Sequence, residues 1–352
     1  MQLNELYDIG STHNLSSRER EILRSIVNMY ILNANPVGSR PLSKYLEGKL
    51  SLSPATLRNV MSDLEDLEYI SHPHTSAGRI PTDKGYRFYV DTLKKIEELS
   101  EKEINTVHKY IALNDSESET VLKEASKVLS VISNCIGIVR IPYLKELIVK
   151  KIELIPLSST NLLVVIALDS NIVRTVTLEA DFEVHHKYAE DIARYINEKI
   201  SGKTLGFLRM NFAEIINENL LKDTPLMRLF IDSVDKVFEN QSNKVKIITS
   251  GTQNIINQPE FEDLSKIKSV IELIEDEDMI IHLLDNLDDY KGSSNIFIGS
   301  ESGKESLKDY SIIIENYQIG SAKGSIGLIG PKRMNYGKMM SIVKMVSSAL
   351  KQ

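Results

Sequence analysis

Two side chains that can hydrogen-bond to nucleic-acid bases, Arg58 and Asn59, lie next to each other in the stretch LSPATLRNVMSDLEDL. Arginine can donate two hydrogen bonds to the edge of a guanine, and asparagine can pair in the same bidentate way with an adenine. The spacing of the apolar residues predicts a helix in this stretch. Ser53 is a good N-cap, and Pro54 suits the first helical position, where its missing N–H costs nothing.

This helix is amphipathic, and its faces predict which residues could touch a ligand. The predicted buried stripe consists of Leu57, Val60, Met61, Leu64 and Leu67. The opposite face carries the small or hydrogen-bonding side chains of Ala55, Arg58, Asn59 and Ser62, with Thr56 at its flank. The acids of the helix all lie in its C-terminal half, so its N-terminal end should enter a DNA groove first. The alternative is an ordinary solvated face, because every amphipathic helix has a polar side.

The segment HPHTSAGRIP, residues 72–81, follows this helix and predicts a β-hairpin. A glycine such as Gly78 would let the hairpin tip turn tightly against DNA. The hydroxyls of Thr75 and Ser76 could hold phosphates, and Arg79 could reach into the minor groove. A hairpin placed directly after a recognition helix is what a winged-helix domain requires.

Two further predicted helices precede the Arg58 helix and would support it. Residues 15–33 begin with Ser16 and Glu19 at capping-box spacing and then repeat apolar residues on one face. Residues 39–50, SRPLSKYLEGKL, predict a short second helix. The three helices together form a helix-turn-helix candidate.

Other combinations that could do chemistry are incomplete. His72 and His74 are spaced like metal ligands, but zinc needs further Cys or His ligands, and the single Cys135 lies far away in an apolar run. The chain has no Gly-x-Ser-x-Gly motif, and GSIGLIGP lacks the lysine of a phosphate-binding P-loop. Close strand packing or a turn explains these glycines better. We therefore predict no metal, no cofactor and no enzymatic activity.

Composition favours an ordinary globular protein. Hydrophobic residues make up 42% and charged residues 26% of the 352 residues, with a net charge of −7. Residues 1–95 hold 12 of the 42 basic and 11 of the 49 acidic residues, so this part carries a net charge of +1. The sequence shows no secretory leader and no apolar run near the roughly 18 residues of a membrane span. We expect a cytoplasmic protein without membrane contact.

The rest of the chain has mixed α/β character, and we place a domain boundary near residue 100. The predicted strands are CIGIVRI, LIVKKIELIPL, TNLLVVIALD, NIVRTVTLE, KVKIITSG, NIFIGS, YSIIIENY and KGSIGLIG. Asp169-Ser170-Asn171 between two of these runs predicts a hairpin turn. Residues 204–290 are mostly helical. Strands, a helical block and further strands predict one sheet that is interrupted by an inserted module.

The stretch LSPATLRNVMSDLEDLEYISHPHTSAGRIPTDKGYRFYV closely resembles the N-terminal signature of HrcA, the bacterial heat-inducible repressor family. The resemblance continues at LSSREREILRSIVNMYILNANPVGSRPLSKYL, NQPEF and GSIGLIGPKRMNY, and so spans nearly the whole chain. It implies dimeric repressors that bind the CIRCE inverted repeat upstream of chaperone operons and are kept active by the GroEL chaperonin. It also implies a winged helix, a GAF-like domain and a dimerising domain inserted into the latter.

With this architecture we expect an α+β multidomain protein. The winged helix-turn-helix would occupy residues 1–100, the GAF-like domain 101–200 and 291–352, and the inserted dimerisation module 201–290. The resemblance and the residue chemistry together assign base contacts to Arg58 and Asn59, with Ala55, Thr56 and Ser62 alongside. They assign the wing contacts to His74, Thr75, Ser76 and Arg79, and a phosphate contact to Arg40, placed before the second helix. Tyr86, Phe88 and Tyr89 are expected to pack the wing against the domain rather than to stack on bases.

Two other functions fit the same motifs. In the first, the GAF-like domain senses a metabolite that changes DNA affinity, which requires a pocket with convergent polar groups that the sequence does not show. In the second, an enzyme carries a fused DNA-binding module, but no catalytic constellation supports it. Our expected partners are double-stranded DNA with an inverted repeat, a second copy of the chain, and GroEL.

Overall fold

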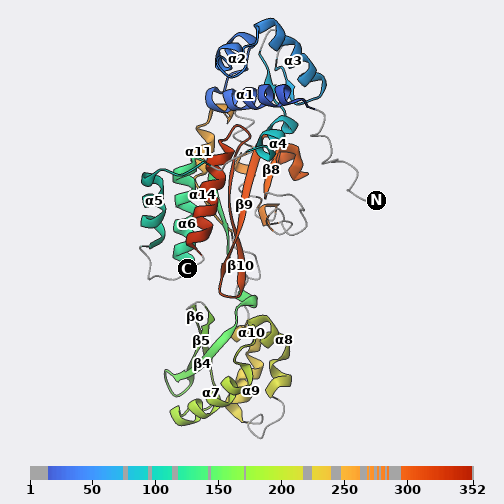
Figure 1. The fold of residues 1–352 in the computed structure, drawn as a ribbon. Helices are drawn as coiled ribbons and strands as arrows, with labels where there is room; N and C mark the ends of the chain where they lie inside the picture. The colour runs from blue at the N-terminus through green and yellow to red at the C-terminus, as the bar shows by residue number, and fades with distance from the viewer. Residues whose placement is uncertain are drawn as a thin grey trace, which may run out of the picture.

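The structure is a computed structural model with three regions along one long axis (Figure 1). It describes residues 15–73, 78–93, 97–112, 118–141, 144–169, 172–216, 224–238, 247–261 and 295–350, together with scattered residues between 268 and 284. The N-terminal helices lie at one end, and a small module from the middle of the sequence lies at the other (Figure 1). Among the helices of these residues, none has both the length and the apolar composition that crossing a membrane requires.

The N-terminal region is a winged-helix domain built from three helices, a small hairpin and a fourth helix. Its elements are α1 (Ser17–Asn33), α2 (Ser39–Tyr45), α3 (Pro54–Asp66), β1 (Ile70–Ser71), β2 (Ile80–Pro81) and α4 (Asp83–Asp91). The predicted capping box of α1 is confirmed, since the Ser16 and Glu19 side chains each bond to the other's backbone N–H. The predicted hairpin is also confirmed, because β1 and β2 pair antiparallel.

The central domain is a five-stranded antiparallel sheet in the order β7-β3-β10-β9-β8. Its strands are β3 (Ile136–Arg140), β7 (Ile247–Ser250), β8 (Ile296–Ile298), β9 (Tyr310–Ile319) and β10 (Ala322–Pro331). Close strand packing accounts for the glycines of β10, because a Cβ at Gly327 would lie 2.3 Å from the Ile313 carbonyl oxygen. A side chain there would not fit without moving the neighbouring strand.

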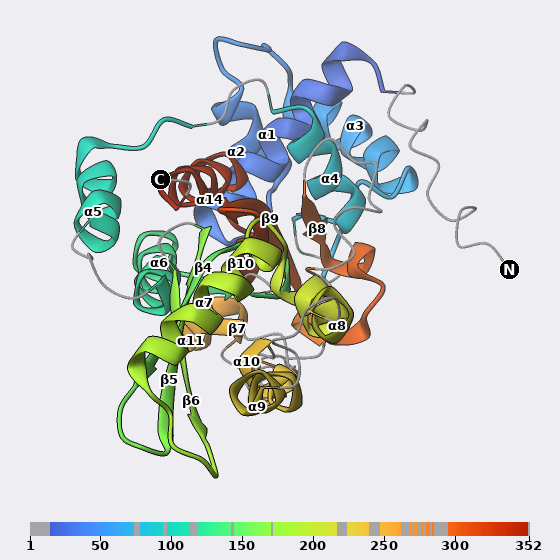
Figure 2. The same ribbon diagram turned by 90° about the horizontal axis from the view of Figure 1, so that it is seen from below.

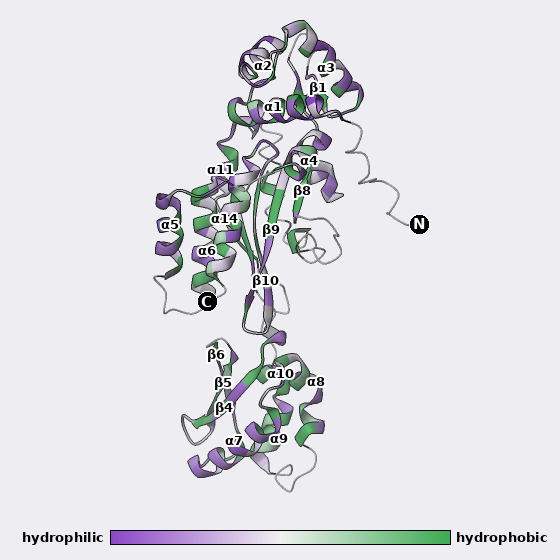
Figure 3. Ribbon diagram, in the orientation of Figure 1, coloured by the Kyte–Doolittle hydropathy of each residue, from purple (hydrophilic) through white to green (hydrophobic). Residues whose placement is uncertain are grey.

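Alternating side chains of this sheet belong to two separate hydrophobic cores. One face packs against α6 (Ser118–Ser133) and α14 (Tyr336–Ala349), and α5 (Glu101–Ala112) lies outside these two helices (Figure 1). The other face packs against α11 (Thr252–Ile256) and the short helix η6 (Pro259–Phe261). Isoleucines are frequent in β8 and β9, and Figure 3 shows β8 and the first half of β9 as hydrophobic. Because both faces of the sheet are covered, its strands carry apolar side chains on both sides.

The inserted module has its own three-stranded antiparallel sheet and its own core. It contains β4 (Val149–Pro156), β5 (Asn161–Leu168), β6 (Val173–Glu179), α7 (His186–Ile200), α8 (Leu205–Ile216), α9 (Pro225–Asp232) and α10 (Val234–Phe238). Helix α7 lies along one face of the sheet (Figure 2). The antiparallel pairing of β5 with β6 confirms the predicted hairpin, although turn residues 170–171 lie outside the described residues.

The predicted domain boundaries within the C-terminal part are wrong. Residues 149–179 were assigned to the GAF-like domain, but their strands pair with one another and not with the five-stranded sheet. Residues 247–250 were assigned to the insertion, but they pair with β3 of the central domain. The inserted module therefore includes the described residues 144–238. Periodicity located each strand, but it carries no information about which strands pair across a long separation.

Candidate nucleic-acid interface

Helix α3 begins with a well-formed N-terminal cap. The Ser53 Oγ accepts a hydrogen bond from the Thr56 backbone N–H (3.1 Å) and lies 2.9 Å from the Thr56 Oγ1. Pro54 occupies the first position, and no acid lies in the first turn. This end of the helix therefore presents its positive dipole without a neighbouring carboxylate to cancel it.

One face of α3 is open to solvent. Leu57, Met61 and Leu64 are buried in the winged-helix core, as predicted. Ala55, Arg58, Asn59 and Ser62 are exposed, while Thr56 is half-buried because it takes part in the cap. These four exposed residues form what we call the recognition face. In the described part of the chain, the side chains of Arg58 and Asn59 have no hydrogen-bond or ion-pair partner, so both groups are free to bind a ligand.

The predicted burial of Leu67 is wrong. Its side chain is 39% exposed, because α3 ends at Asp66 and Leu67 is its C-cap. Glu68 then adopts a left-handed conformation with φ of 62°, which turns the chain away from the helix axis. The 3.6-residue period therefore no longer applies at position 67.

Arg79 of the wing is held at two points. Its backbone N–H and C=O bond to the C=O and N–H of Val37, at 2.9 and 2.8 Å. Its guanidinium Nη2 lies 2.7 Å from the Glu65 carboxylate in the last turn of α3. The His72 ring also bonds to Glu65. Partial burial alone would raise the pKa of Glu65, but the His72 hydrogen bond and the Arg79 charge outweigh it and lower that pKa.

Gly78 was expected to allow a tight turn at the hairpin tip, but the structure shows a different role. A Cβ at this position would lie 2.6 Å from the Val37 carbonyl carbon and 2.7 Å from that of Pro36. Gly78 therefore lets the wing pack closely on the loop between α1 and α2. His74, Thr75 and Ser76 lie outside the described residues, so their predicted contacts stay predictions.

Arg40 lies inside the first turn of α2 rather than before it, because the helix already begins at Ser39. Gly38 is the N-cap, and Pro41 fits the first turn, where no intrahelical N–H is needed. The Arg40 side chain is exposed. It is thus available to solvent near a helix N-terminus, where anions are favoured.

The other candidate groups are placed as follows. In the described residues, no three His, Cys, Asp or Glu side chains are arranged to hold a metal ion. His185 is the N-cap of α7, and His186 lies 3.3 Å from Glu190 on the same helix. Cys135 is buried, which raises the pKa of its thiol to about 11. A thiol that stays protonated in this way is a poor nucleophile.

Sequence reasoning missed the residues that fix the winged-helix domain on the central domain. We call this contact the interdomain joint. Asp83 of α4 lies 2.7 Å from Lys332 and accepts a hydrogen bond from the Ser300 backbone N–H, and Arg87 donates to Glu301 at 2.7 Å. The only sequence signal was the basic pair in GPKRMNY, which has no visible partner until the chain folds.

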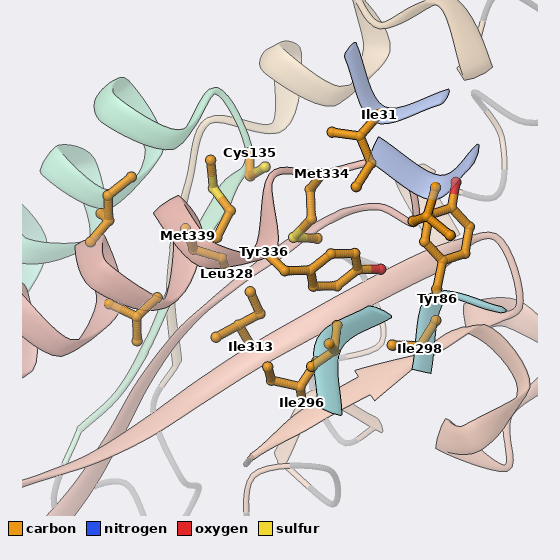
Figure 4. Close-up of a cluster of buried hydrophobic side chains, with 14 of the residues drawn as sticks. Ile31, Tyr86, Cys135, Ile296, Ile298, Ile313, Leu328, Met334, Tyr336 and Met339 are labelled. Atoms are coloured by element: carbon orange, nitrogen blue, oxygen red, sulfur yellow. The ribbon is translucent and has the colours of Figure 1, made fainter. Parts of the chain in front are cut away.

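Aromatic side chains fill the interior of the interdomain joint. Tyr86 of α4 packs on Tyr336 of α14, with 6.1 Å between the ring centroids, and Ile31 and Met334 lie beside them (Figure 4). Phe88 contacts Tyr69 edge-on at 5.9 Å within the winged-helix domain. Tyr86 and Phe88 are both buried, as expected of packing residues, but the ring contact of Tyr86 is with the central domain and not, as predicted, between the wing and its own domain.

A surface cavity of about 240 Å³ lies between α1, the end of α2 and α4. Its walls include Arg24, Tyr45 and Tyr89. It lies in the winged-helix domain and not in the central domain, where a metabolite sensor would need it. The α11 side of the central sheet is filled by packed side chains that include Phe261 and Tyr310, whose rings stack at 5.3 Å.

Comparisons with known proteins agree with this geometry. Residues 14–95 match the family model described as "Winged helix-turn-helix transcription repressor, HrcA DNA-binding", and residues 119–340 match "HrcA protein C terminal domain". A heat-inducible transcription repressor HrcA from Chlorobium phaeobacteroides (strain BS1) is 35% identical over 347 residues, covering 96% of this chain and 98% of the relative. The chain belongs to the HrcA family.

Other HrcA proteins show a comparable likeness. The heat-inducible transcription repressor HrcA of Ruminiclostridium cellulolyticum is 34% identical, covering 96% of this chain and 97% of the relative. A crystal structure described as that of a hypothetical protein at 2.2 Å resolution is similar in fold, with a TM-score of 0.63 and 27% identity. It covers 96% of this chain and 98% of its own. The HrcA winged helix is thus the DNA-binding domain of this chain, and the overall class is an α+β multidomain repressor.

Proposed function

We propose that this HrcA-family chain is a dimeric repressor of chaperone operons that reads an inverted-repeat operator of the CIRCE type. The observation that carries the proposal is the recognition face, where Arg58 and Asn59 are exposed with no partner among the described residues. Buried or paired side chains could not bind bases without first losing their existing contacts. Here the groups are already free at the N-terminal half of a helix that carries no acid in its first turn.

The proposed contacts divide into base reading and phosphate binding. Arg58 and Asn59 would bind base edges in the major groove, with Ala55, Thr56 and Ser62 lining the same surface. Arg40 at the start of α2 would bind a phosphate. We also propose phosphate or minor-groove contacts for the wing residues His74, Thr75 and Ser76.

An inverted repeat has two-fold symmetry, so a two-fold dimer would place one winged helix on each half-site. The inserted module offers a surface for such a dimer. Helix α7 covers one face of its sheet, and the other face bears apolar side chains. Ile155 is 39% exposed and Val173 61%, and Leu163 pairs across from Ile155 on the same face. Exposed apolar side chains that share one sheet face favour association with a second copy.

The GroEL partnership and the cytoplasmic location are proposals that rest on the family resemblance. If GroEL keeps the repressor active, misfolded proteins that occupy the chaperonin during heat stress would relieve repression. DNA-binding activity measured after heating, with and without GroEL, tests this. Recovery of binding only when GroEL is present supports the partnership, and equal recovery without it contradicts it.

Operator specificity is tested by titrating the inverted repeat and a scrambled duplex of equal length and composition with the full-length protein. The titration is repeated at several salt concentrations, because phosphate contacts alone make binding salt-dependent. The proposal predicts binding to the repeat that is tighter by about a thousandfold or more. Equal affinity for both duplexes would contradict the specific-repressor proposal.

A further inference from the structure

The carboxylate of Glu65 contacts the wing at both of its arms. β1 ends at Ser71 and β2 begins at Ile80, so His72 and Arg79 are the residues next to the two strand ends. Both side chains bond to Glu65 in the last turn of α3. One carboxylate therefore ties the start and the end of the wing loop to the recognition helix.

The Arg79–Glu65 pair is partly enclosed. The two side chains are 27% and 22% exposed, and the Nε atom of Arg79 is buried, with no hydrogen-bond partner among the described residues. The guanidinium is thus turned into the domain rather than out into solvent. A partly buried ion pair is screened less by salt than an exposed one, so it can hold its geometry.

A second attachment fixes the same point of the chain. The Arg79 backbone forms a two-bond bridge with Val37, and Gly78 packs directly on the Pro36–Val37 peptide. The bridge sets the position of the wing root, and Glu65 sets the direction of the Arg79 side chain. The root of the wing at Arg79 is thus fixed relative to both the turn before α2 and the end of α3.

We propose that Glu65 is a positioning residue for operator recognition, which holds the wing at a fixed angle to α3 by binding Arg79 and His72 together. Wing and recognition helix must fit neighbouring grooves at the same time, so a fixed angle stabilises the specific complex. Arg79 then acts through this pair rather than as an independent phosphate contact. The inference rests on the proposed DNA-binding function.

The proposal makes a prediction opposite to that of simple electrostatics. Removing an acid beside a DNA-binding surface should raise affinity, because phosphates repel carboxylates. Asp66 is the matched control, since it is the next residue, is exposed, and has no partner among the described residues. We expect Asp66→Asn to bind the operator as tightly as the wild type or more tightly. We expect Glu65→Gln to bind it more weakly by about tenfold.

The experiment measures operator and scrambled-duplex affinity at several salt concentrations for the full-length wild type, Glu65→Gln, Arg79→Gln and the double variant. If the pair acts as one unit, the two single losses are equal, the double variant is no worse than either, and the salt slope stays unchanged. Thermal unfolding of each variant verifies that it is folded. A merely structural defect would lower affinity for both duplexes, whereas lost positioning lowers affinity for the operator alone.

A loss of affinity for both duplexes would overturn the inference, and so would two other results. Tighter operator binding by Glu65→Gln would show that the carboxylate only repels DNA. Additive losses, with a salt slope that falls by about one for Arg79→Gln alone, would make Arg79 a phosphate contact. Failure of the wild type to prefer the operator would instead overturn the proposed function. Failure of the Glu65 inference can therefore be distinguished from failure of the proposed DNA-binding function.

Discussion

The two sides of the winged-helix domain are built in opposite ways. On the recognition face of α3, Arg58 and Asn59 are exposed and have no partner among the described residues. On the side that meets the central domain, Asp83 and Arg87 of α4 are paired, and Tyr86 is buried. The side chains that face the central domain thus hold the winged helix in place, and those of the recognition face remain available to bind a ligand. The contrast suggests that substitutions on the two sides should separate stability from DNA binding.

The largest expected effect is on stability, at the interdomain joint. Tyr336 is fully buried, its hydroxyl donates to the Lys332 carbonyl at 2.8 Å, and burial raises the pKa of its phenol. Replacement by alanine removes a large packed side chain and should lower the free energy of unfolding by about 3–5 kcal/mol. Denaturant unfolding measures it. Ser62→Ala on the recognition face is the control, and its free energy of unfolding should change by no more than about 0.5 kcal/mol. Equal losses of unfolding free energy in the two variants would contradict the difference between the two sides of the domain.

A smaller effect is expected at Arg40, the proposed phosphate contact in the first turn of α2. Arg40→Ala should weaken binding to the operator and to scrambled DNA by the same factor, because phosphate contacts carry no sequence information. The slope of log affinity against log salt should fall by about one. Arg194→Ala on α7 removes the same charge from an exposed site in the inserted module and should leave the slope unchanged. If Arg40→Ala left the slope of log affinity against log salt unaltered, Arg40 would not be a phosphate contact.

The smallest effect concerns an ion pair outside both surfaces, between Glu103 of α5 and Lys338 of α14. The Lys338 hydrogen bond, followed by those from Ser100, lowers the pKa of Glu103 to about 2. A carboxyl with a lowered pKa stabilises the fold above its unfolded pKa of 4.5, and this stabilisation is lost as the pH falls towards 2.

Glu103→Gln should therefore cost about 1 kcal/mol of unfolding free energy at pH 7, since a half-buried ion pair close to the surface is still screened by solvent. The difference from the wild type should shrink between pH 4.5 and pH 2. Unfolding curves at pH 7, 4.5 and 2.5 measure this trend. Glu101→Gln on the same helix serves as the exposed control. A difference that stays constant with pH would contradict the assigned pairing.

Local patterns were sufficient to predict most elements of the fold. The helix predicted at residues 15–33 matches α1, because its apolar residues recur at helical spacing and form one buried side. The recognition face was predicted for the same reason, since Leu57, Met61 and Leu64 fix which side of α3 is buried. Both predictions needed only neighbours within a few turns of the chain.

Contacts between distant residues could not be predicted in this way. Arg87 and Glu301 are separated by 214 positions, and neither carries a local signal that identifies the other. The inserted module was misplaced because its strands resemble those of the central sheet in composition, and only pairing distinguishes the two sheets. The Arg79–Glu65 pair was not predicted either, because Glu65 lies on the preceding helix and the turn that brings the two side chains together depends on tertiary packing.

The central claim is that the recognition face reads bases, and a base-by-base scan of one operator half-site tests it most directly. Affinity is measured for the wild type and for Arg58→Ala on each singly substituted operator. The account predicts that the variant loses about 1–3 kcal/mol of specific binding and its preference at one position, while its preferences elsewhere remain. A variant that keeps every preference of the wild type, or loses all of them equally, would contradict the assignment of Arg58 to a base.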